Sequence, residues 1–443
     1  MKNNYEVFID RVRDCFSGAA GCFRVEMDCG ERRPLDWLIS QPVGSRYYWT
    51  DRDGQFEMAG IGECDVVEPD GPCSIQQTLR GIRMNISTSA ENCRYYGGFR
   101  FHAGAKPNAC WHDFKDYRFV LPLLELCRDG ERCYWACNIR KDTNSDRVMD
   151  ALLAAKSQES KPQQFSADFL QRIDLPDSAE WEELVRKALG AITSGQMQKV
   201  VLARQSTLRA DSPVDPVALL RRLALRSANT YLFCFEPTGE RAFLGASPER
   251  LYKRIGDKIY SEALAGTRPR GDCREADAQY EKELLQCDKE QREHQIVVSD
   301  IRAVLDEYCR DVVVADGPEV MKLTYCQHLH TAIRGVLVEG KSDTALLEAL
   351  HPTPAVGGLP KEAAMRWIFD NEPFERGVYA GPVGWIGADD AEFCVGIRSG
   401  LIRRDTLTLY SGAGIVAGAD ARAEWRELDA KLANFLAVIT KEG

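Results

Sequence analysis

Apolar runs joined in pairs by tight turns are the feature of this sequence that most limits its fold. RYYWTDRDGQFEMAGIG, residues 46–62, predicts two strands joined by an Asp-Gly turn, and residues 117–139 predict two more on either side of Gly130. RVEMDCGERRPLDWL, residues 24–38, predicts another strand followed by a turn. Strands connected by so few residues pair in antiparallel fashion. Residues 1–150 are therefore predicted to be a β-rich N-terminal subregion.

The sequence pattern changes after residue 150. Residues 151–178 contain the polar, aperiodic stretch AAKSQESKPQQFSADF, which is typical of a surface linker. The segment SAEWEELVRKALGAITSGQ has apolar residues at helical spacing behind a predicted N-cap at Ser178. Strands and long helices then mix to the end of the chain. We expect residues 179–443 to form a catalytic region of mixed α+β structure, integrated with the N-terminal subregion into one fold.

The charge of the chain excludes some kinds of partner. The 443 residues include 57 Lys and Arg against 67 Asp and Glu, which gives a net charge of −10. Nucleic-acid binders need a basic face, so no nucleic-acid partner is expected. A small anionic substrate would need a local positive cluster or a metal ion at its site to overcome repulsion by this net negative charge. No stretch approaches the ~18 apolar residues that span a bilayer, so no membrane partner is expected.

Sixteen cysteines occur in the chain, ten of them in residues 1–150, and no two have CxxC spacing. The missing spacing argues against a zinc site. The N-terminal segment MKNNYEVFIDRVRDCF carries charges throughout and lacks the apolar core of a signal peptide. We therefore interpret the cysteines as reduced thiols, packed as small apolar groups, and expect a cytoplasmic protein.

Two segments of the catalytic region offer a general base and a general acid. In QMQKVVLAR, Lys199 opens an apolar strand, where partial burial would lower its pKa toward a useful base. In FLGASPERLYKR, the residues 247–249 form a turn between two strands, and Glu249 would serve as an acid if its site were apolar. Taken alone, a lysine or a glutamate in such a segment is more often an ordinary solvated side chain than a catalytic group.

Two predicted helices each present a pair of carboxylates. Glu290 and Glu293 are three residues apart, as are Glu424 and Glu427, and Lys431 follows on the face of the second pair. Each pair alone fits a solvated acidic face. Facing each other, the two pairs would repel strongly without a cation, and carboxylate oxygens suit Mg²⁺. The sequence therefore predicts a magnesium site between these helices.

Small residues and one buried cation complete the candidate site. The Ala-Gly-Thr segment at 265–267 offers backbone N–H groups for contact with a carboxylate or an oxyanion. Arg398 lies in the apolar run EFCVGIRSGLI, where it needs an anionic partner, and its guanidinium matches a carboxylate bidentately. Gly412 and Gly414 follow a dinucleotide-like pattern, but too few residues follow them for a nicotinamide site. These segments together predict a site for a small polycarboxylate held by Mg²⁺ and Arg398.

Nine short segments of the catalytic region, in the same order, closely resemble the chorismate-utilising enzymes, a family that includes isochorismate, salicylate, anthranilate and aminodeoxychorismate synthases. The resemblance covers about residues 175–440 and rests on KVVLAR, FLGASPERL, EALAGTRPRG, REHQIVV, LHPTPAVGGLP, RGVYAGPVGW, FCVGIRSGLI, YSGAGIV and EWRELDAK. RYYWTDRDG looks more loosely like the N-terminal region of menaquinone-pathway isochorismate synthases. The family implies large antiparallel sheets in a sandwich flanked by helices, the fold of anthranilate synthase component I. It also implies a Mg²⁺-dependent attack on the chorismate ring with loss of the 4-hydroxyl.

The resemblance implies a role for each matching residue. Lys199 corresponds to the base that activates water, and Glu249 to the acid that protonates the departing hydroxyl. The other matches are the metal ligands Glu293 and Glu427, a second and often water-mediated acidic pair Glu290 and Glu424, the enolpyruvyl carboxylate binders Arg398 and Tyr379 with the backbone of Gly412 and Gly414 beside them, the ring-carboxylate and metal contacts Gly266, Thr267 and Lys431, and His328 near the departing hydroxyl. His330 is interpreted as incidental.

Three positions favour isochorismate synthase within this family. Lys199 stands where the anthranilate-forming enzymes usually have glutamine, which favours water over ammonia and predicts no glutaminase subunit. Ala265 stands where aminodeoxychorismate synthases often carry a nucleophilic lysine, and Ala355 where salicylate synthases tend to have threonine. A salicylate synthase, an aminating enzyme and a catalytically silent chorismate-binding relative are the alternatives. The product could feed menaquinone, siderophore or salicylate synthesis, with menaquinone favoured by the N-terminal resemblance, and the chain is expected to be a monomer or homodimer.

Overall fold

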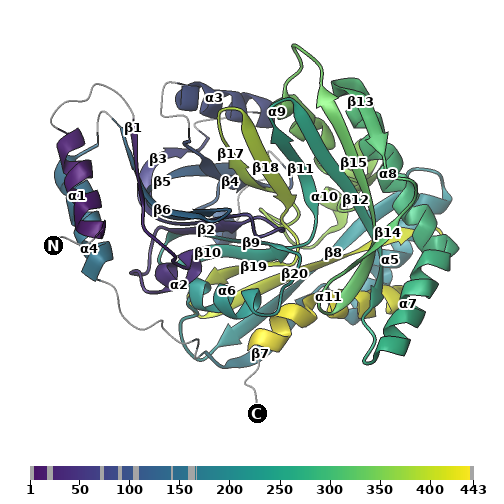
Figure 1. Cartoon of the computed structure of the whole chain (residues 1–443). Helices are drawn as coiled ribbons and strands as arrows, with labels where there is room; N and C mark the ends of the chain where they lie inside the picture. The colour runs from purple at the N-terminus through teal and green to yellow at the C-terminus, as the bar shows by residue number, and fades with distance from the viewer. Residues whose placement is uncertain are drawn as a thin grey trace.

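A continuous antiparallel network of strands forms the centre of the protein (Figure 1). The computed structural model describes residues 4–16, 23–69, 74–87, 92–102, 109–140, 143–157, 165 and 167–439. Within these residues, all twenty strands are hydrogen-bonded into one system, and every pairing is antiparallel. Two arms leave the central pair of β3 (Phe56–Val67) and β5 (Tyr117–Asp129).

The first arm, here called the β8 arm, continues from β3. Its strands pair in the order β2, β9, β10, β19, β20 and β8, and both β7 and β16 pair with β8. Their bounds are β2 (Arg46–Thr50), β9 (Tyr231–Thr238), β10 (Arg241–Ser247), β19 (Ser399–Arg403), β20 (Thr406–Val416), β8 (Lys199–Ala210), β7 (Phe169–Leu175) and β16 (Gly358–Leu359).

The second arm, the β15 arm, continues from β5 through β4, β17, β18, β11, β12 and β15, with β13 and β14 both on β15. β6 and β1 extend the network from another part of β5. Their bounds are β4 (Tyr95–Phe99), β17 (Pro382–Ile386), β18 (Asp390–Val395), β11 (Arg250–Ile255), β12 (Lys258–Pro269), β15 (Cys326–Leu337), β13 (Cys309–Val314), β14 (Glu319–Lys322), β6 (Arg132–Ile139) and β1 (Phe23–Asp28).

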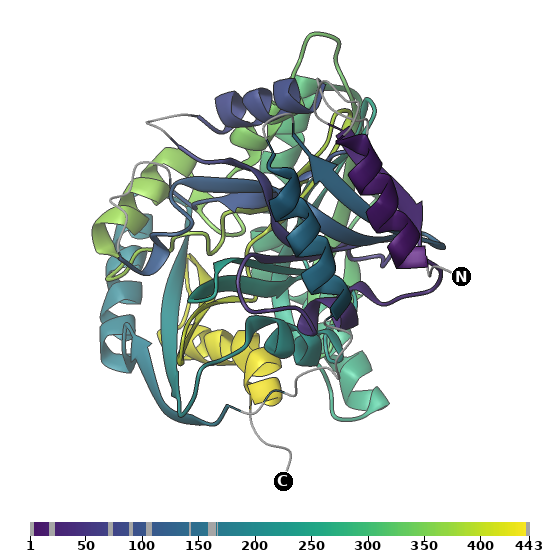
Figure 2. The same cartoon turned by 90° about the vertical axis from the view of Figure 1, so that its left-hand side faces the viewer.

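Helices cover the outer faces of both arms (Figure 1). α8 packs on β12, β13 and β15, while α11 packs on β20 beside α5 and α6. α1 and α4 pack side by side at the end near β1 (Figure 2). The helices are α1 (Asn4–Cys15), α2 (Pro34–Ile39), α3 (Ile75–Ser87), α4 (Ser145–Ser157), α5 (Ser178–Thr193), α6 (Pro216–Ala224), α7 (Arg274–Gln286), α8 (Asp288–Tyr308), α9 (Asp343–Leu350), α10 (Lys361–Asn371) and α11 (Ala421–Ile439), with a short 3₁₀ turn η1 (Ala109–Trp111).

The predicted hairpins are confirmed, and so is the mixed fold of large antiparallel sheets with flanking helices. β2 and β3 pair across the Asp53-Gly54 turn, where Gly54 has a φ of +64°. β5 and β6 pair across the turn at Gly130, where φ is +57°. A positive φ at a turn is easily reached by glycine, which is why both turns contain it.

The prediction of a linker over residues 151–178 is wrong in part. Residues up to Ser157 complete helix α4, and Phe169–Leu175 form β7, hydrogen-bonded along one side to β8. Most residues of β7 are exposed, so the strand lacks the alternation of apolar and polar residues that marks a half-buried strand. The N-cap of α5 is Asp177 rather than Ser178, and it forms a capping box with Glu180. Residues 158–164 lie outside the described part of the chain.

The N-terminal subregion contributes strands to both arms. β2 pairs with β9 in the β8 arm, and β4 pairs with β17 in the β15 arm. The indole of Trp111 is fully buried, with its ring centroid 5.5 Å from that of Phe243 on β10 and 5.9 Å from that of Tyr410 on β20. One hydrophobic cluster therefore includes side chains from the N-terminal subregion and from both arms.

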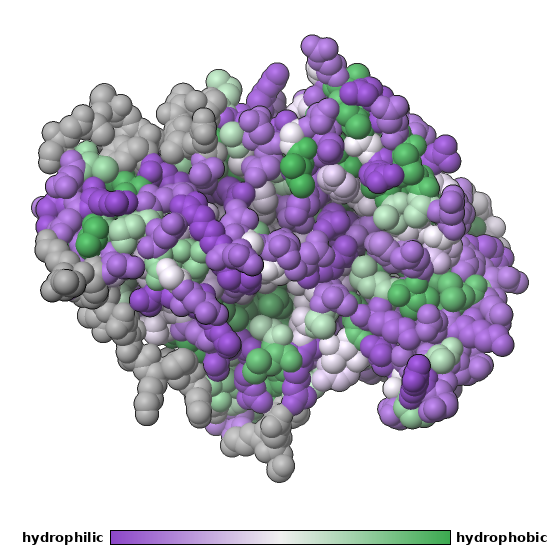
Figure 3. All heavy atoms as spheres, in the orientation of Figure 1, coloured by the Kyte–Doolittle hydropathy of each residue, from purple (hydrophilic) through white to green (hydrophobic). Residues whose placement is uncertain are grey.

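Hydrophilic residues dominate the face of the molecule seen in Figure 3, with hydrophobic residues scattered among them. Of the helices in the described residues, none has both the length and the apolar character needed to cross a membrane. Fourteen cysteines lie among the described residues, and no disulfide joins any two of them.

We propose that the N-terminal subregion and the catalytic region fold as one unit, and Gly377→Ala tests this. Gly377 has a φ of +56°, and a Cβ there would lie 2.0 Å from the Trp111 ring. We expect a loss of about 3 kcal/mol in the free energy of unfolding, because the added methyl is both strained and overpacked.

Gly54→Ala is the matched control, since Gly54 also has a positive φ but no atom within 4 Å of the added Cβ. Gly54→Ala should lower the free energy of unfolding by about 1 kcal/mol. Denaturant unfolding followed by tryptophan fluorescence and by far-UV circular dichroism measures both variants. Two separate transitions, or equal losses in the two variants, would contradict the single unit.

Candidate functional site

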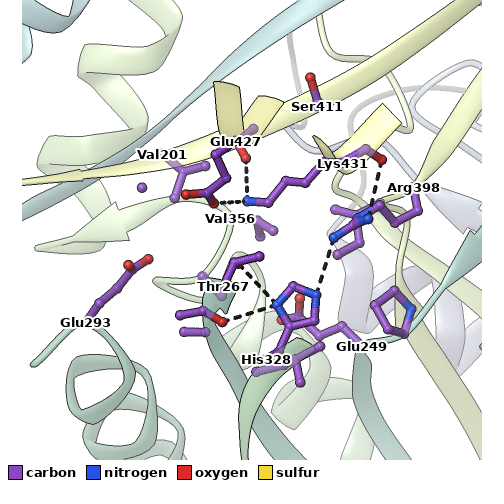
Figure 4. A pocket seen from close by; sticks show the side chains of 18 of the residues that line it. Val201, Glu249, Thr267, Glu293, His328, Val356, Arg398, Ser411, Glu427 and Lys431 are labelled. Atoms are coloured by element: carbon purple, nitrogen blue, oxygen red, sulfur yellow. Dashed lines mark hydrogen bonds and ion pairs between the residues drawn. The ribbon is translucent and has the colours of Figure 1, made fainter. Parts of the chain in front are cut away.

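A pocket lies between the two arms, and both arms line it (Figure 4). Strand residues from β8, β12, β15 and β20 form its walls, α8 and α11 each contribute side chains, and loop residues complete it. Most of the predicted site residues line this pocket, namely Glu249, Gly266, Thr267, Glu293, His328, Tyr379, Arg398, Gly412, Gly414, Glu427 and Lys431. Lys199, Glu290 and Glu424 stand behind the lining.

Lys199 is the first residue of β8 and its side chain is fully buried. Its Nζ donates a hydrogen bond of 2.8 Å to Oε1 of Glu293, which comes from α8. Gly414 on β20 leaves room for this pair, because a Cβ there would lie 2.5 Å from Glu293 Oε1 and 3.1 Å from Lys199 Cε. The lysine at the start of an apolar strand is thus desolvated and held beside a pocket-lining carboxylate.

Glu249 occupies the turn between β10 and β11 and is 3% exposed. Burial raises its pKa to about 8; the carboxylate of Glu262 adds to this shift, and Lys199 and Lys431 oppose it. The turn itself is fixed by Ser247, whose hydroxyl donates to the Val395 carbonyl at 2.6 Å. A carboxyl group with this pKa is mostly protonated at neutral pH, so Glu249 can donate a proton into the pocket.

The ALAGT segment is a bulged strand rather than a loop. The register of β12 against β15 shifts between Ala265 and Thr267, and Gly266 at the bulge has a φ of +78°. The backbone N–H of Thr267, predicted to be free for a ligand, donates instead to Oε2 of Glu290 at 3.2 Å. Glu290 also accepts a bond of 2.8 Å from Arg268, so this carboxylate is held behind the pocket wall.

Side chains of α8 and α11 approach each other, since Lys289 on α8 bonds to Glu424 on α11. Burial raises the pKa of Glu424 to about 7, and repulsion from Glu427 and Glu293 contributes to the shift. Lys289 neutralises Glu424 at 2.8 Å, and Lys431 bonds to Glu427 at 2.6 Å. Burial opposes ionisation of Glu427, but Lys431 outweighs it and lowers the pKa.

The oxygen atoms of these carboxylates are the kind of ligand that a hard divalent cation prefers. Each of the four carboxylates is matched by a basic side chain, and in the described residues no three acidic, His or Cys side chains gather as a ready ligand set. Repulsion between carboxylates on two helices is the electrostatic situation that a cation relieves. Oxygen ligands for such an ion would come from Glu293 and Glu427, which line the pocket.

Arg398 lies between β18 and β19, with a φ of +49°, rather than inside a strand as predicted. Its Nη2 is 3.3 Å from both the Cys326 Sγ and the His328 Nε2, and Nη1 donates to the Lys431 carbonyl at 3.3 Å. Among the described residues, no carboxylate pairs with this guanidinium. It therefore presents a cation at the pocket for which a ligand carboxylate is the natural partner.

His328 links the two sides of this corner of the pocket (Figure 4). Its Nδ1 is 3.2 Å from the Gly266 carbonyl and 3.1 Å from the Thr267 hydroxyl, which fits Nδ1–H as the donor to the carbonyl. Tyr379 approaches from another loop, and a Cβ on Gly412 would lie 2.9 Å from its hydroxyl. These groups give the pocket several neutral hydrogen-bonding partners beside Arg398.

Two residues of this site, Cys326 and Ser411, were not predicted from the sequence. Cys326 is buried, and although burial opposes it, Arg398 and His328 lower the thiol pKa to about 6. Its position two residues before His328 on a strand places both on one face, which was the available signal. The buried hydroxyl of Ser411 lines the pocket and has no hydrogen-bond partner within the described residues.

Comparison with known proteins identifies the family of this chain. The family model described as chorismate binding enzyme matches residues 15–440. Isochorismate synthase 2 of Arabidopsis thaliana is 36% identical over 85% of this chain and 69% of its own length, and isochorismate synthase MenF of Bacillus subtilis is 33% identical over 90% and 89%. The solved structure of MenF, the menaquinone-specific isochorismate synthase of Escherichia coli, superimposes with a TM-score of 0.86 at 28% identity, over 99% of this chain and all of that one. The chain therefore belongs to the family of chorismate binding enzymes.

Proposed function

We propose that this protein is an isochorismate synthase, which adds water to C2 of chorismate while the C4 hydroxyl departs. The observation that carries the proposal is a buried, protonated glutamic acid in the lining of the pocket and a buried lysine that is bonded to another lining residue, Glu293. Lys199 comes from the β8 arm and Glu249 from the turn between β10 and β11. Family membership and relatives named isochorismate synthase support the same reaction.

The substrate is held by its carboxylates. Arg398 and Tyr379 bind the enolpyruvyl carboxylate, with the backbone of Gly412 beside it, because this corner holds a guanidinium without a carboxylate partner among the described residues. Lys431 and Thr267, which line the pocket, would contact the ring carboxylate. Two anionic groups of one ligand thus meet cationic groups from separate elements of the pocket, which fixes the orientation of the ring.

The proposed reaction uses two proton transfers. Lys199 accepts a proton from the water that adds to C2, and Glu249 donates its proton to the C4 hydroxyl as that group departs. The net reaction moves a hydroxyl group from C4 to C2, so the same two residues serve in reverse with their protonation exchanged. The Lys199–Glu293 bond of the free protein must loosen before the lysine can act as the base.

Magnesium is part of this proposal. Glu293 and Glu427 would hold it directly, and Glu290 and Glu424 through water. When bound, the ion would neutralise the ring carboxylate and draw electron density from the ring. Binding would require Lys199 and Lys431 to release their carboxylates, which frees the lysine that the reaction needs as its base.

Residue identities at three positions support water as the nucleophile and isochorismate as the final product. Lys199 is suited to activate water, and Ala265 on the pocket wall offers no nucleophile for a covalent route. Ala355, a third lining residue, stands where salicylate synthases tend to have threonine. We propose that the product enters menaquinone synthesis in the cytoplasm without a glutaminase subunit.

The test of the function is product analysis. The purified protein is incubated with chorismate and Mg²⁺, without ammonia, and the products are separated by chromatography. We expect isochorismate, and we expect EDTA to abolish its formation. Salicylate with pyruvate, or an aminated product formed only on addition of ammonia, would refute the proposal, as would chorismate binding without turnover.

Glu249→Gln should lower kcat by 10²–10⁴-fold, because glutamine keeps the shape of the side chain but cannot donate the proton. In the unaltered protein, kcat/KM should fall as the pH rises through about 8, where Glu249 loses its proton. Steady-state rates between pH 6 and pH 10 measure both effects. If kcat/KM does not fall at alkaline pH, or if Glu249→Gln is fully active, Glu249 is not the general acid.

Gly414→Ala should weaken chorismate binding by about tenfold, equal to about 1.4 kcal/mol, because the methyl displaces the Lys199–Glu293 pair. The free energy of unfolding should fall by about 1–3 kcal/mol, since the methyl shifts a buried ion pair without removing either partner. Gly190→Ala, on α5 with no atom within 4 Å of the added Cβ, is the control and should bind normally. Calorimetric titration with chorismate measures the affinity of both variants. Equal affinities of Gly414→Ala and Gly190→Ala would contradict the role given to Gly414.

A further inference from the structure

Arg52 connects the N-terminal subregion to the turn that carries Glu249. It lies in the turn between β2 and β3, and its Nη1 and Nη2 donate to the two carboxylate oxygens of Glu262 at 2.6 and 2.8 Å. The same Nη1 also donates to the carbonyl of Pro248 at 2.9 Å. A single guanidinium thus joins the N-terminal subregion, strand β12 and the residue immediately before Glu249.

Glu262 holds the residue on the other side of Glu249. Its Oε1 accepts the backbone N–H of Arg250 at 3.0 Å, in addition to the bond from Arg52. Its Oε2 is 3.1 Å from His330 Nε2, so this histidine, interpreted from the sequence as incidental, takes part in the cluster. The cluster therefore hydrogen-bonds to the backbone on both sides of Glu249, at Pro248 and at Arg250.

The same cluster places a fixed charge beside the acid. Glu262 is 3% exposed, yet hydrogen bonds and charge from His330 and Arg52 overcome its burial and lower its pKa to about 2. Its negative charge acts on Glu249 and raises the pKa of that carboxyl group. The other titratable groups that interact with Glu249 are Lys199 on β8, Lys431 on α11, Tyr379 in the loop before β17 and Cys394 on β18.

Lys199 and Lys431 both favour the ionised form of Glu249. Of the interacting groups that carry charge, Glu262 opposes them. Removing the charge of Glu262 should therefore leave the two lysines unopposed, and Glu249 would lose its proton at lower pH.

We propose that Arg52, Glu262 and His330 form a positioning unit for the general acid, which fixes the turn on both sides of Glu249 and keeps its proton in place by a permanent neighbouring charge. The inference rests on the proposed function, in which Glu249 protonates the departing hydroxyl. None of the three residues lines the pocket, so the unit acts through Glu249 rather than on the substrate.

Glu262→Gln tests the charge, because the amide keeps the size of the side chain. In the pH dependence of kcat/KM, we expect the alkaline limb to move to lower pH by on the order of one unit, since one like charge is removed from a buried carboxyl group. Glu262→Asp, which keeps the charge, should leave the limb close to its original position. A purely structural ion pair would change stability without moving this limb.

Glu236→Gln is the matched control. Glu236 is a buried carboxylate paired with Arg46, an arginine of the same N-terminal subregion, and it is not among the groups that act on Glu249. Its removal should leave the alkaline limb in place. A limb that stays fixed in folded Glu262→Gln, or that moves equally in Glu236→Gln, would overturn the inference.

Arg52→Lys provides a second route, should Glu262→Gln fail to fold. A lysine ammonium lacks the planar fork with which the guanidinium bonds to both carboxylate oxygens in parallel and reaches the Pro248 carbonyl. We expect kcat to fall by about tenfold with KM changed less than about twofold, because the acid is misplaced while the binding groups are untouched. An unchanged kcat would overturn the positioning role. Failure of the proposed function itself is distinguishable, since the unaltered protein would then form no isochorismate.

Discussion

Charge that is buried between the two arms must be neutralised, and this constraint organises the centre of the protein. The ion pair of Lys199 with Glu293 joins the β8 arm to α8, which packs on the β15 arm. The other carboxylates are matched in the same way, by Lys431, Lys289 and Arg268. An unpaired buried charge would cost several kcal/mol, so each of these contacts supports the closure of the site.

Two groups depart from this pairing, and both belong to the proposed chemistry. Glu249 has no basic partner in direct contact among the described residues and stays protonated because it is buried near another carboxylate. Arg398 has no carboxylate partner among the described residues, and its neighbours are the Cys326 sulfur, an imidazole and a carbonyl. The free protein thus keeps one proton to donate and one guanidinium that a ligand carboxylate can bind, while the other pocket carboxylates are paired with basic side chains.

Much of the site could be predicted from the sequence because its residues are set by local geometry. The three-residue spacing of Glu290 with Glu293 places both on one helical face, and Lys199 stands at the start of an apolar run. The contacts of Arg52 could not be predicted, since they join residues about 200 positions apart through a strand register that the sequence does not display. Strand β7 was missed for a different reason, because an edge strand with mostly exposed residues carries no alternating pattern.

The central claim is that a buried base and a buried acid add water at C2 and release the C4 hydroxyl. The most direct test is to run the reaction briefly in ¹⁸O-labelled water and to measure the ¹⁸O content of the isochorismate by mass spectrometry. The account predicts one ¹⁸O atom per product molecule, located on C2, from the first turnovers onward. Unlabelled isochorismate would mean that the departing hydroxyl itself migrates within the pocket, and would contradict the role given to Lys199.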